Sequence, residues 1–130
     1  MKQYSKTIPT SFDFLDNFRL AKTDNERYNL LLEEIDDTDV DDYYGNIEQL
    51  LFNYDYGHGT IQNVEITDGE VSKDGKGVLN VEFEVDYYFG CDDYNRTDED
   101  NMQIGVSINF KNGEITIIGE EEQERLPDEY

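Results

Sequence analysis

The sequence predicts an α+β fold, in which two to three N-terminal helices pack on one face of a C-terminal antiparallel four-stranded meander. Two observations carry this prediction. Apolar residues recur at steps of three and four in the first half and at every second position in the second half. Asp-Gly and Asn-Gly pairs, which are typical of hairpin turns, interrupt only the second half. A chain of 130 residues has the size of one domain. We therefore expect a single domain over 1–130, with a helical part at about 11–56, a sheet at about 60–119 and an acidic tail at 120–130.

Three helices are expected in the first half. Ser11 is a suitable N-cap for a helix at about 12–21. Thr23 and Glu26 have the spacing of a capping box, which predicts a second helix at about 24–36. A third helix, at about 40–54, follows a cap at Thr38 or Asp39. The apolar stripes are Phe14, Phe18 and Ala21 in the first helix, Tyr28, Leu31, Leu32 and Ile35 in the second, and Val40, Tyr43, Ile47, Leu50, Leu51 and Tyr54 in the third.

Four strands are expected in the second half, at about 60–67, 78–89, 103–110 and 114–118. The second has the clearest alternation, with Leu79 and the apolar residues at every second position after it on one face. Residues 90–101 are expected to form a loop. Both Asp68-Gly69 and Asp74-Gly75 are turn signals, and the sequence leaves open which of them closes the first hairpin. The sheet face opposite the helices would expose Glu65, Glu82, Glu84, Asp86 and Glu114.

The last hairpin has a predicted register. Asn112-Gly113 suits a two-residue type I′ turn, because both of its central positions need a positive φ. Such a turn pairs charged residues on one face and apolar residues on the other, as a consistent register requires. The predicted pairs are Lys111 with Glu114, Phe110 with Ile115, and Ile108 with Ile117.

Net charge is the feature that sets this chain apart. The chain has 32 acidic and 10 basic residues, which gives a formal charge of −22, whereas an ordinary small domain stays soluble with a magnitude of ~2–8. Solubility alone therefore does not account for the excess. A surface this acidic repels nucleic acid and anionic membranes, so the partners that it favours are basic.

The sequence offers no site for catalysis or for a cofactor. His58 lies between two glycines, and no residue adjacent in sequence could orient it as a general base. Cys91 precedes Asp92 and Asp93, whose negative charge opposes formation of a thiolate. No glycine-rich phosphate-binding motif occurs. We therefore expect neither an enzyme nor a bound cofactor.

One segment has the spacing of a calcium-binding loop. Its candidate ligands occupy the first, third, fifth and twelfth positions of an EF-hand-like loop, but Asp42 stands at the sixth, where the sharp turn needs glycine. We therefore predict no metal site and retain a calcium-binding acidic module as an alternative. The candidate ligands are Asp37, Asp39, Asp41 and Glu48.

Carboxylates and tyrosines alternate in three stretches, at 36–56, 82–94 and, more loosely, the C-terminus. Tyrosine is enriched at protein interfaces, so these stretches indicate a surface that presents negative charge to a basic partner. The candidate partner-binding residues are Asp36, Asp37, Asp41, Asp42, Tyr44, Glu48, Asp55, Tyr56, Glu82, Glu84, Asp86, Tyr88, Asp92, Asp93, Tyr94, Asp98, Glu99 and Asp100.

These observations favour a non-enzymatic inhibitor that mimics nucleic acid and blocks the cationic groove of a nucleic-acid-binding protein. In charge and size the chain is similar in kind to phage-encoded DNA mimics of the anti-restriction, anti-CRISPR and nuclease-inhibitor types, although no motif matches them. An immunity or antitoxin protein that binds a basic toxin is an alternative. The absence of a signal peptide and the single cysteine predict a cytoplasmic protein. The sequence leaves open whether DNA or RNA is imitated and whether the chain forms a homodimer.

Overall fold

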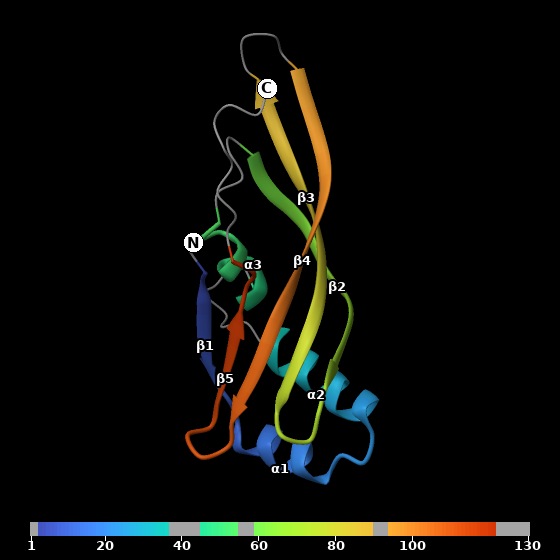
Figure 1. Cartoon of the computed structure of the whole chain (residues 1–130), viewed down its shortest axis with the longest axis vertical. Helices are drawn as coiled ribbons and strands as arrows, with labels where there is room; N and C mark the ends of the chain where they lie inside the picture. Colours follow the sequence, from blue (N-terminus) through green and yellow to red (C-terminus); the bar gives the residue numbers. More distant parts are fainter. Residues whose placement is uncertain (1–2, 37–44, 55–58, 90–93, 122–130) are drawn as a thin grey trace.

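The computed structural model describes residues 3–36, 45–54, 59–89 and 94–121, which form three helices and one antiparallel sheet (Figure 1). The predicted α+β class is confirmed, with five strands where four were expected. The elements in chain order are β1 (Ser5–Pro9), α1 (Phe12–Leu20), α2 (Asp24–Asp36), α3 (Asn46–Leu51), β2 (Gly59–Val71), β3 (Lys76–Phe89), β4 (Tyr94–Asn109) and β5 (Glu114–Ile118).

The additional strand is β1, at one edge of a sheet with the order β1-β5-β4-β3-β2. The sequence predicted only that this N-terminal segment is extended. Its single buried apolar residue, Ile8, gives too short a pattern to identify a strand, and Pro9 argues against one. Proline is nevertheless accommodated at a sheet edge. Here Ile8 pairs with Ile115, and Pro9 pairs with Glu114 at the end of the ladder.

The first two helices begin where their caps predicted. The Ser11 hydroxyl accepts a hydrogen bond from the Phe14 amide at 3.2 Å, and the Thr23 hydroxyl accepts one from the Glu26 amide at 3.1 Å. The Glu26 carboxylate, however, accepts from the amide of Lys22 at 3.1 Å, one residue before the cap itself. The cap therefore also fixes the connection between α1 and α2.

The third helix is shorter than predicted, because it begins at Asn46 rather than at about residue 40. Gly45 is its N-cap and has an extended backbone (φ −69°, ψ 170°), so the helix cannot continue toward the N-terminus through it. Glycine is a poor helix former and an acceptable N-cap. The Asn46 side chain donates to the carbonyl of Ile35 at 2.8 Å and thereby joins the start of α3 to the end of α2. The predicted core residues Val40 and Tyr43 lie outside the described residues.

One core fills the space between the helices and one face of the sheet. The remaining predicted core positions of α3 are buried, as are Leu31 and Ile35 of α2 and most inward-facing apolar residues of β1, β3, β4 and β5, whereas those of β2 are only partly buried apart from Val71. The fully buried side chains include Phe18, Leu31, Ile35, Leu50, Leu51, Leu79, Val81, Ile104, Ile115 and Ile117. Below, the inner face of the sheet is the face that these side chains cover, and the outer face is the opposite one.

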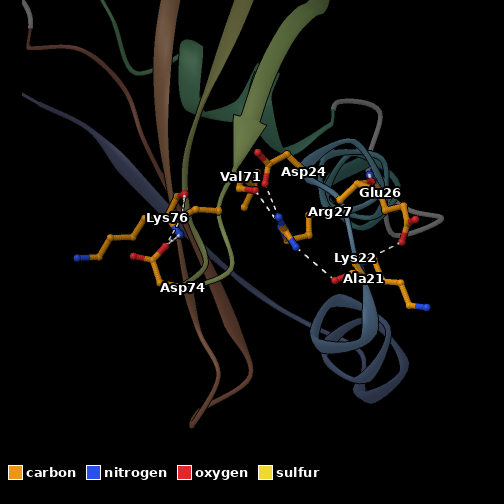
Figure 2. A network of polar contacts seen from close by, with 10 residues as sticks. Ala21, Lys22, Asp24, Glu26, Arg27, Val71, Asp74 and Lys76 are labelled. Atoms are coloured by element: carbon orange, nitrogen blue, oxygen red, sulfur yellow. Dashed lines mark hydrogen bonds and ion pairs between the residues drawn. The ribbon is translucent and has the colours of Figure 1, made fainter.

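Arg27 is a buried charged residue that the apolar pattern did not identify. Its side chain is 4 % exposed and reaches from α2 toward the end of β2 (Figure 2). The guanidinium donates to the carbonyl of Val71 at 3.2 Å and to that of Ala21 at 3.3 Å, and it forms an ion pair with Asp24. Because it bonds to three different segments, it ties the α1–α2 connection to the sheet.

The first hairpin turn is at Asp74-Gly75, which resolves the choice that the sequence left open. Gly75 has a φ of +86°, a conformation that only glycine adopts readily. The Ser72 amide donates to the Lys76 carbonyl at 3.0 Å and closes the loop. Gly69 instead lies within β2, which continues to Val71.

The turn carboxylate at Asp74 has a pKa below its ordinary value of 3.8, because it accepts hydrogen bonds from the Ser72 hydroxyl and, at 3.1 Å, from the Lys76 amide. The depressed pKa means that this carboxylate stabilises the turn above about pH 4, and that this contribution is lost as the pH falls through the lower folded-state pKa. We expect Ser72→Ala to move the titration midpoint of Asp74 upward, toward 3.8, as measured by carboxyl-carbon NMR. An unchanged midpoint would contradict this assignment.

The predicted register of the last hairpin is wrong by two residues. Ile108 pairs with Ile115, and Asn109 pairs with Glu114, so that the loop has four residues rather than two. Within this four-residue loop only Gly113 has a positive φ, whereas a type I′ turn needs two such residues. The Asn109 side-chain oxygen also accepts hydrogen bonds from the amides of Lys111 and Asn112, each at 3.1 Å. A slip of two residues keeps every side chain on its face. The separation of charged and apolar pairs therefore fits both registers equally well.

Residues 94–101 form a strand, where the sequence predicted a loop. They belong to β4, which pairs with β3 in an unbroken register from Lys76–Ser107 to Phe89–Tyr94. Their polar composition hid the strand, because the hydrophobic alternation on which the prediction relied begins only at Met102. The long β3–β4 hairpin extends the sheet along the long axis of the molecule (Figure 1).

Gly119 follows β5 directly beneath the ring of Tyr54, which contacts Tyr4 edge to face. The Tyr54 hydroxyl donates to the carbonyl of Glu120 at 2.6 Å. A Cβ at Gly119 would lie 2.1 Å from this hydroxyl oxygen, so a side chain there must displace a buried ring.

We expect Gly119→Ala to lower the free energy of unfolding by about 1–3 kcal/mol, the usual cost of overpacking. Gly105→Ala is the matched control, since its Cβ would meet only the carbonyl oxygen of Ile118, at 3.8 Å. Urea unfolding followed by circular dichroism measures both variants. Equal stability of the two would show that Tyr54 does not occupy this space.

Candidate interaction surface

The outer face of the sheet carries a group of carboxylates on three adjacent strands. Strand alternation places them opposite the buried side chains, and cross-strand pairing brings them together: Glu82 pairs with Glu65 of β2, and Glu84 pairs with Glu99 of β4. Of these side chains, Glu65, Glu82 and Glu99 are exposed. The name outer acidic face is used below for Glu65, Glu82, Glu84, Asp86 and Glu99.

The side chains that donate hydrogen bonds to this face are neutral. The Glu84 carboxylate accepts from the side-chain amides of Gln62 at 3.1 Å and Asn63 at 3.2 Å. The Asp86 carboxylate accepts from the Thr97 hydroxyl at 3.1 Å. These bonds orient the two carboxylates without removing their charge.

No ion pair compensates the outer acidic face within the described residues. The two ion pairs of the described chain join Arg27 to Asp24 and Arg96 to Asp98, and both lie elsewhere. Like charges placed directly opposite in a sheet are destabilising. The Glu65–Glu82 and Glu84–Glu99 pairs are therefore arrangements that fold stability alone would not select.

The shape of this face comes from irregularities in β2. Its register with β3 shifts twice, between Gln62 and Glu65 and between Ile66 and Asp68, and each shift adds one residue to β2 as a bulge does. Asn63, in the first bulge, has a φ of +52°. A hollow of about 480 Å³ opens beside it, lined by Asn63, Glu65, Glu82, Glu84, Glu99 and Asn101 among others.

The residues proposed from the sequence do not form one continuous surface. Asp98 and Asp100 pair with the buried residues Val85 and Phe83, so they share the inner face of the sheet. There Arg96 lies 3.1 Å from Asp98 and stacks over the ring of Tyr87 at 4.8 Å. The sequence prediction placed these carboxylates with Glu99 in one loop, whereas the strand separates them to opposite faces.

The other predicted residues are divided between the helical side and segments that the structure does not describe. Glu48 lies in the first turn of α3, on the inner side of the sheet. Asp36 is the last residue of α2, and Tyr88 and Tyr94 belong to β3 and β4. Tyr54, which belongs to the predicted apolar stripe of the third helix, is buried, and Tyr87 of β3 is half-buried. Outside the described residues lie His58, Cys91, Asp37, Asp39, Asp41, Asp42, Tyr44, Asp55, Tyr56, Asp92 and Asp93.

Glu65 and Asn63 are site residues that the sequence-based set did not include. Glu65 was expected on the exposed sheet face, and its pairing with Glu82 follows from the observed hairpin. Asn63 carried no signal, because its position depends on a bulge that the alternation of β2 does not reveal.

No group of three or more His, Cys, Asp or Glu residues in the described ranges is arranged to hold a metal ion. Three of the four candidate calcium ligands lie outside those ranges. Carboxylates on neighbouring strands thus approach one another here without forming a cage of oxygen ligands.

None of the helices in the described part of the chain is long and apolar enough to cross a membrane. No protein-family model, curated protein or solved structure matches this chain.

Proposed function

We propose that this protein is a non-enzymatic inhibitor that imitates the charge of a nucleic acid and occupies the cationic groove of a nucleic-acid-binding protein in the cytoplasm. The observation that carries the proposal is the outer acidic face, whose carboxylates have no ion-pair partner among the described residues. A defence or nuclease protein of the restriction or CRISPR kind is the expected target class.

The density of charge on the outer acidic face supports this proposal. Alternate residues of a strand are ~6.6 Å apart and neighbouring strands are ~4.8 Å apart. From Glu82 to Asp86 the face therefore spans ~13 Å, with about one carboxylate per ~2.6 Å. Duplex DNA carries one negative charge per ~1.7 Å of its axis. The two densities are of the same order, so Lys and Arg side chains that are spaced for phosphates could contact these carboxylates.

The rigidity of the support also favours mimicry over a merely solvated surface. The carboxylates project from three hydrogen-bonded strands, and two of them are oriented by neutral donors. Little conformational freedom is lost when such a surface binds. Inhibition would be competitive with nucleic acid, fast in association and strongly weakened by salt.

The test is a competition experiment. The immobilised protein captures basic proteins from a host lysate at low salt, and each captured protein is then assayed for displacement of a fluorescent DNA or RNA duplex. Glu65→Gln/Glu82→Gln removes two charges from the outer acidic face. Asp16→Asn/Glu33→Gln is the matched control, because it removes two exposed charges from α1 and α2.

We expect the wild-type and control proteins to displace the duplex equally, and the outer-face variant to need about tenfold more protein, which corresponds to about 1.4 kcal/mol. Equal displacement by all three would contradict a role for this face. Retention of a target that binds no nucleic acid would contradict mimicry and favour a toxin-binding function.

A further inference from the structure

The long hairpin leaves one edge of β4 without a neighbouring strand among the described residues. β5 pairs with β4 only from Asn109 to Gly105, whereas β4 begins at Tyr94. The recorded β4–β5 pairing ends at Gly105–Ile118, and the next residue, Gly119, donates its amide to the Tyr4 carbonyl on the β1 side, at 2.9 Å. Within the part of the chain that the structure describes, the stretch of β4 before Ile104 is therefore a sheet edge on the side away from β3.

The hydrogen-bonding groups on this edge can be identified. The Ile108 amide donates toward β3, to the Gly75 carbonyl, at 2.9 Å. In an antiparallel sheet, the backbone N–H and C=O groups of successive residues point alternately to the two neighbouring strands. The groups of odd-numbered β4 residues therefore point away from β3. Ser107 and Gly105 direct theirs to β5, in the pairs with Thr116 and Ile118. The corresponding N–H and C=O groups of Gln103, Asn101, Glu99 and Thr97 face the open edge.

The two strands that flank β3, β2 and β4, differ in how regularly they pair with it. On β2, the opposite edge, two bulges interrupt the register with β3, a common way to prevent further strand addition. On β4 the register with β3 is unbroken, so the free groups repeat at regular intervals. The β4 edge is thus the one whose backbone could accept another strand.

The side chains along this edge are acidic on both faces of the sheet. Glu99 projects from the outer face, while Asp98 and Asp100, on either side of it, project from the inner face. A strand added here would have residues on both faces next to a carboxylate. A second copy of this chain would place its own acidic edge against this one, which like-charge repulsion disfavours.

We propose that the β4 edge from Thr97 to Gln103 binds an extended Lys- or Arg-rich segment of a partner protein by strand addition. Backbone hydrogen bonds would supply the affinity in this mode of recognition, and the flanking carboxylates would select a cationic sequence. The inference deepens the proposed function, on which it rests for a basic partner, and adds the way in which that partner is held.

The probe is an alternating arginine–threonine heptapeptide, compared with the same peptide N-methylated at every backbone amide, so that neither edge of the peptide keeps an N–H donor. Both carry the same charge, but the methylated one cannot pair along a strand. In the protein, Glu99→Pro removes a donor on the open edge and leaves the ladder to β3 intact, as proline at an edge does. Glu99→Gln is the matched control, since it removes the same charge and keeps the N–H. Calorimetry at low salt measures each affinity.

We expect N-methylation of the peptide to weaken binding about tenfold or more, because several backbone hydrogen bonds are lost. Glu99→Pro should weaken binding of the unmethylated peptide by a similar factor relative to Glu99→Gln. Equal affinities for the two peptides, or no binding of either, would overturn strand addition. Failure of the proposed function is distinguished by a separate experiment, the duplex competition of Glu65→Gln/Glu82→Gln, which leaves the backbone donors of the β4 edge unchanged.

Discussion

Replacing Arg27 with methionine is expected to lower the free energy of unfolding by about 1–3 kcal/mol, the cost of leaving a buried hydrogen-bond acceptor without its donor. The guanidinium is the donor to the carbonyls of Val71 and Ala21 and the cation beside Asp24. Methionine fills a similar volume, so the loss reports these polar contacts rather than a cavity. A domain of 130 residues has a total stability of about 6–20 kcal/mol, so a loss of this size is readily measured against it.

Urea unfolding at fixed ionic strength is the suitable measurement, because guanidinium chloride would itself screen the charge of the chain. Arg27→Lys is the control. It keeps the charge, but an ammonium group cannot reproduce the forked geometry that contacts separate acceptors, so an intermediate loss is expected. A loss below about 1 kcal/mol for Arg27→Met would mean that water replaces the guanidinium at its acceptors.

The sequence contained the signal for Arg27, although the apolar pattern alone did not reveal it. Arg27, Leu31 and Ile35 are spaced by four residues, and the last two are fully buried. A helix places such residues on one face, so the burial of Arg27 follows from that of its neighbours. A search for apolar residues selects Tyr28 instead, which is only partly buried.

Helix caps and inward-facing strand positions were predictable because they depend on local geometry. The cap at Ser11 and the capping box at Thr23 needed only the identities of residues within one turn. The turn at Asp74-Gly75 could not be chosen over Asp68-Gly69 from the sequence, since both dipeptides suit a turn equally. The choice depends on bulges in β2, which allow that strand to continue through Gly69 to Val71.

The errors arose where tertiary contacts override local preference. Phe110 was assigned to a strand, but its ring packs 5.7 Å from that of Phe18, centroid to centroid, within the loop that follows β4. The polar start of β4 forms a strand because it pairs with β3, not because of its own alternation. The same pairing places Asp98 and Glu99 on opposite faces, which no linear reading of an acidic segment can establish.

The electrostatics of the fold connect its stability with the proposed binding. Carboxylates that face one another across strands repel at close range, and the remaining negative charge of the chain adds to this repulsion. A cationic partner would relieve both contributions. The surface whose repulsion destabilises the free protein is therefore the one that would contribute most binding free energy with a basic partner.

We accordingly expect Glu65→Gln/Glu82→Gln to stabilise the free protein while weakening its binding. Removing the like-charge pair should raise the free energy of unfolding by about 0.5–1 kcal/mol at low salt. The gain should shrink as salt rises, since the screening length falls from about 30 Å at 0.01 M to about 10 Å at 0.1 M. Urea titrations at these two ionic strengths measure the gain in stability, with Asp16→Asn/Glu33→Gln as the control that lacks a cross-strand partner.

If both double variants gained equally, the cost would come from total charge rather than from the outer acidic face. If the outer-face variant instead lost stability, its glutamates would be structural, and loss of binding could no longer be read as loss of a contact surface.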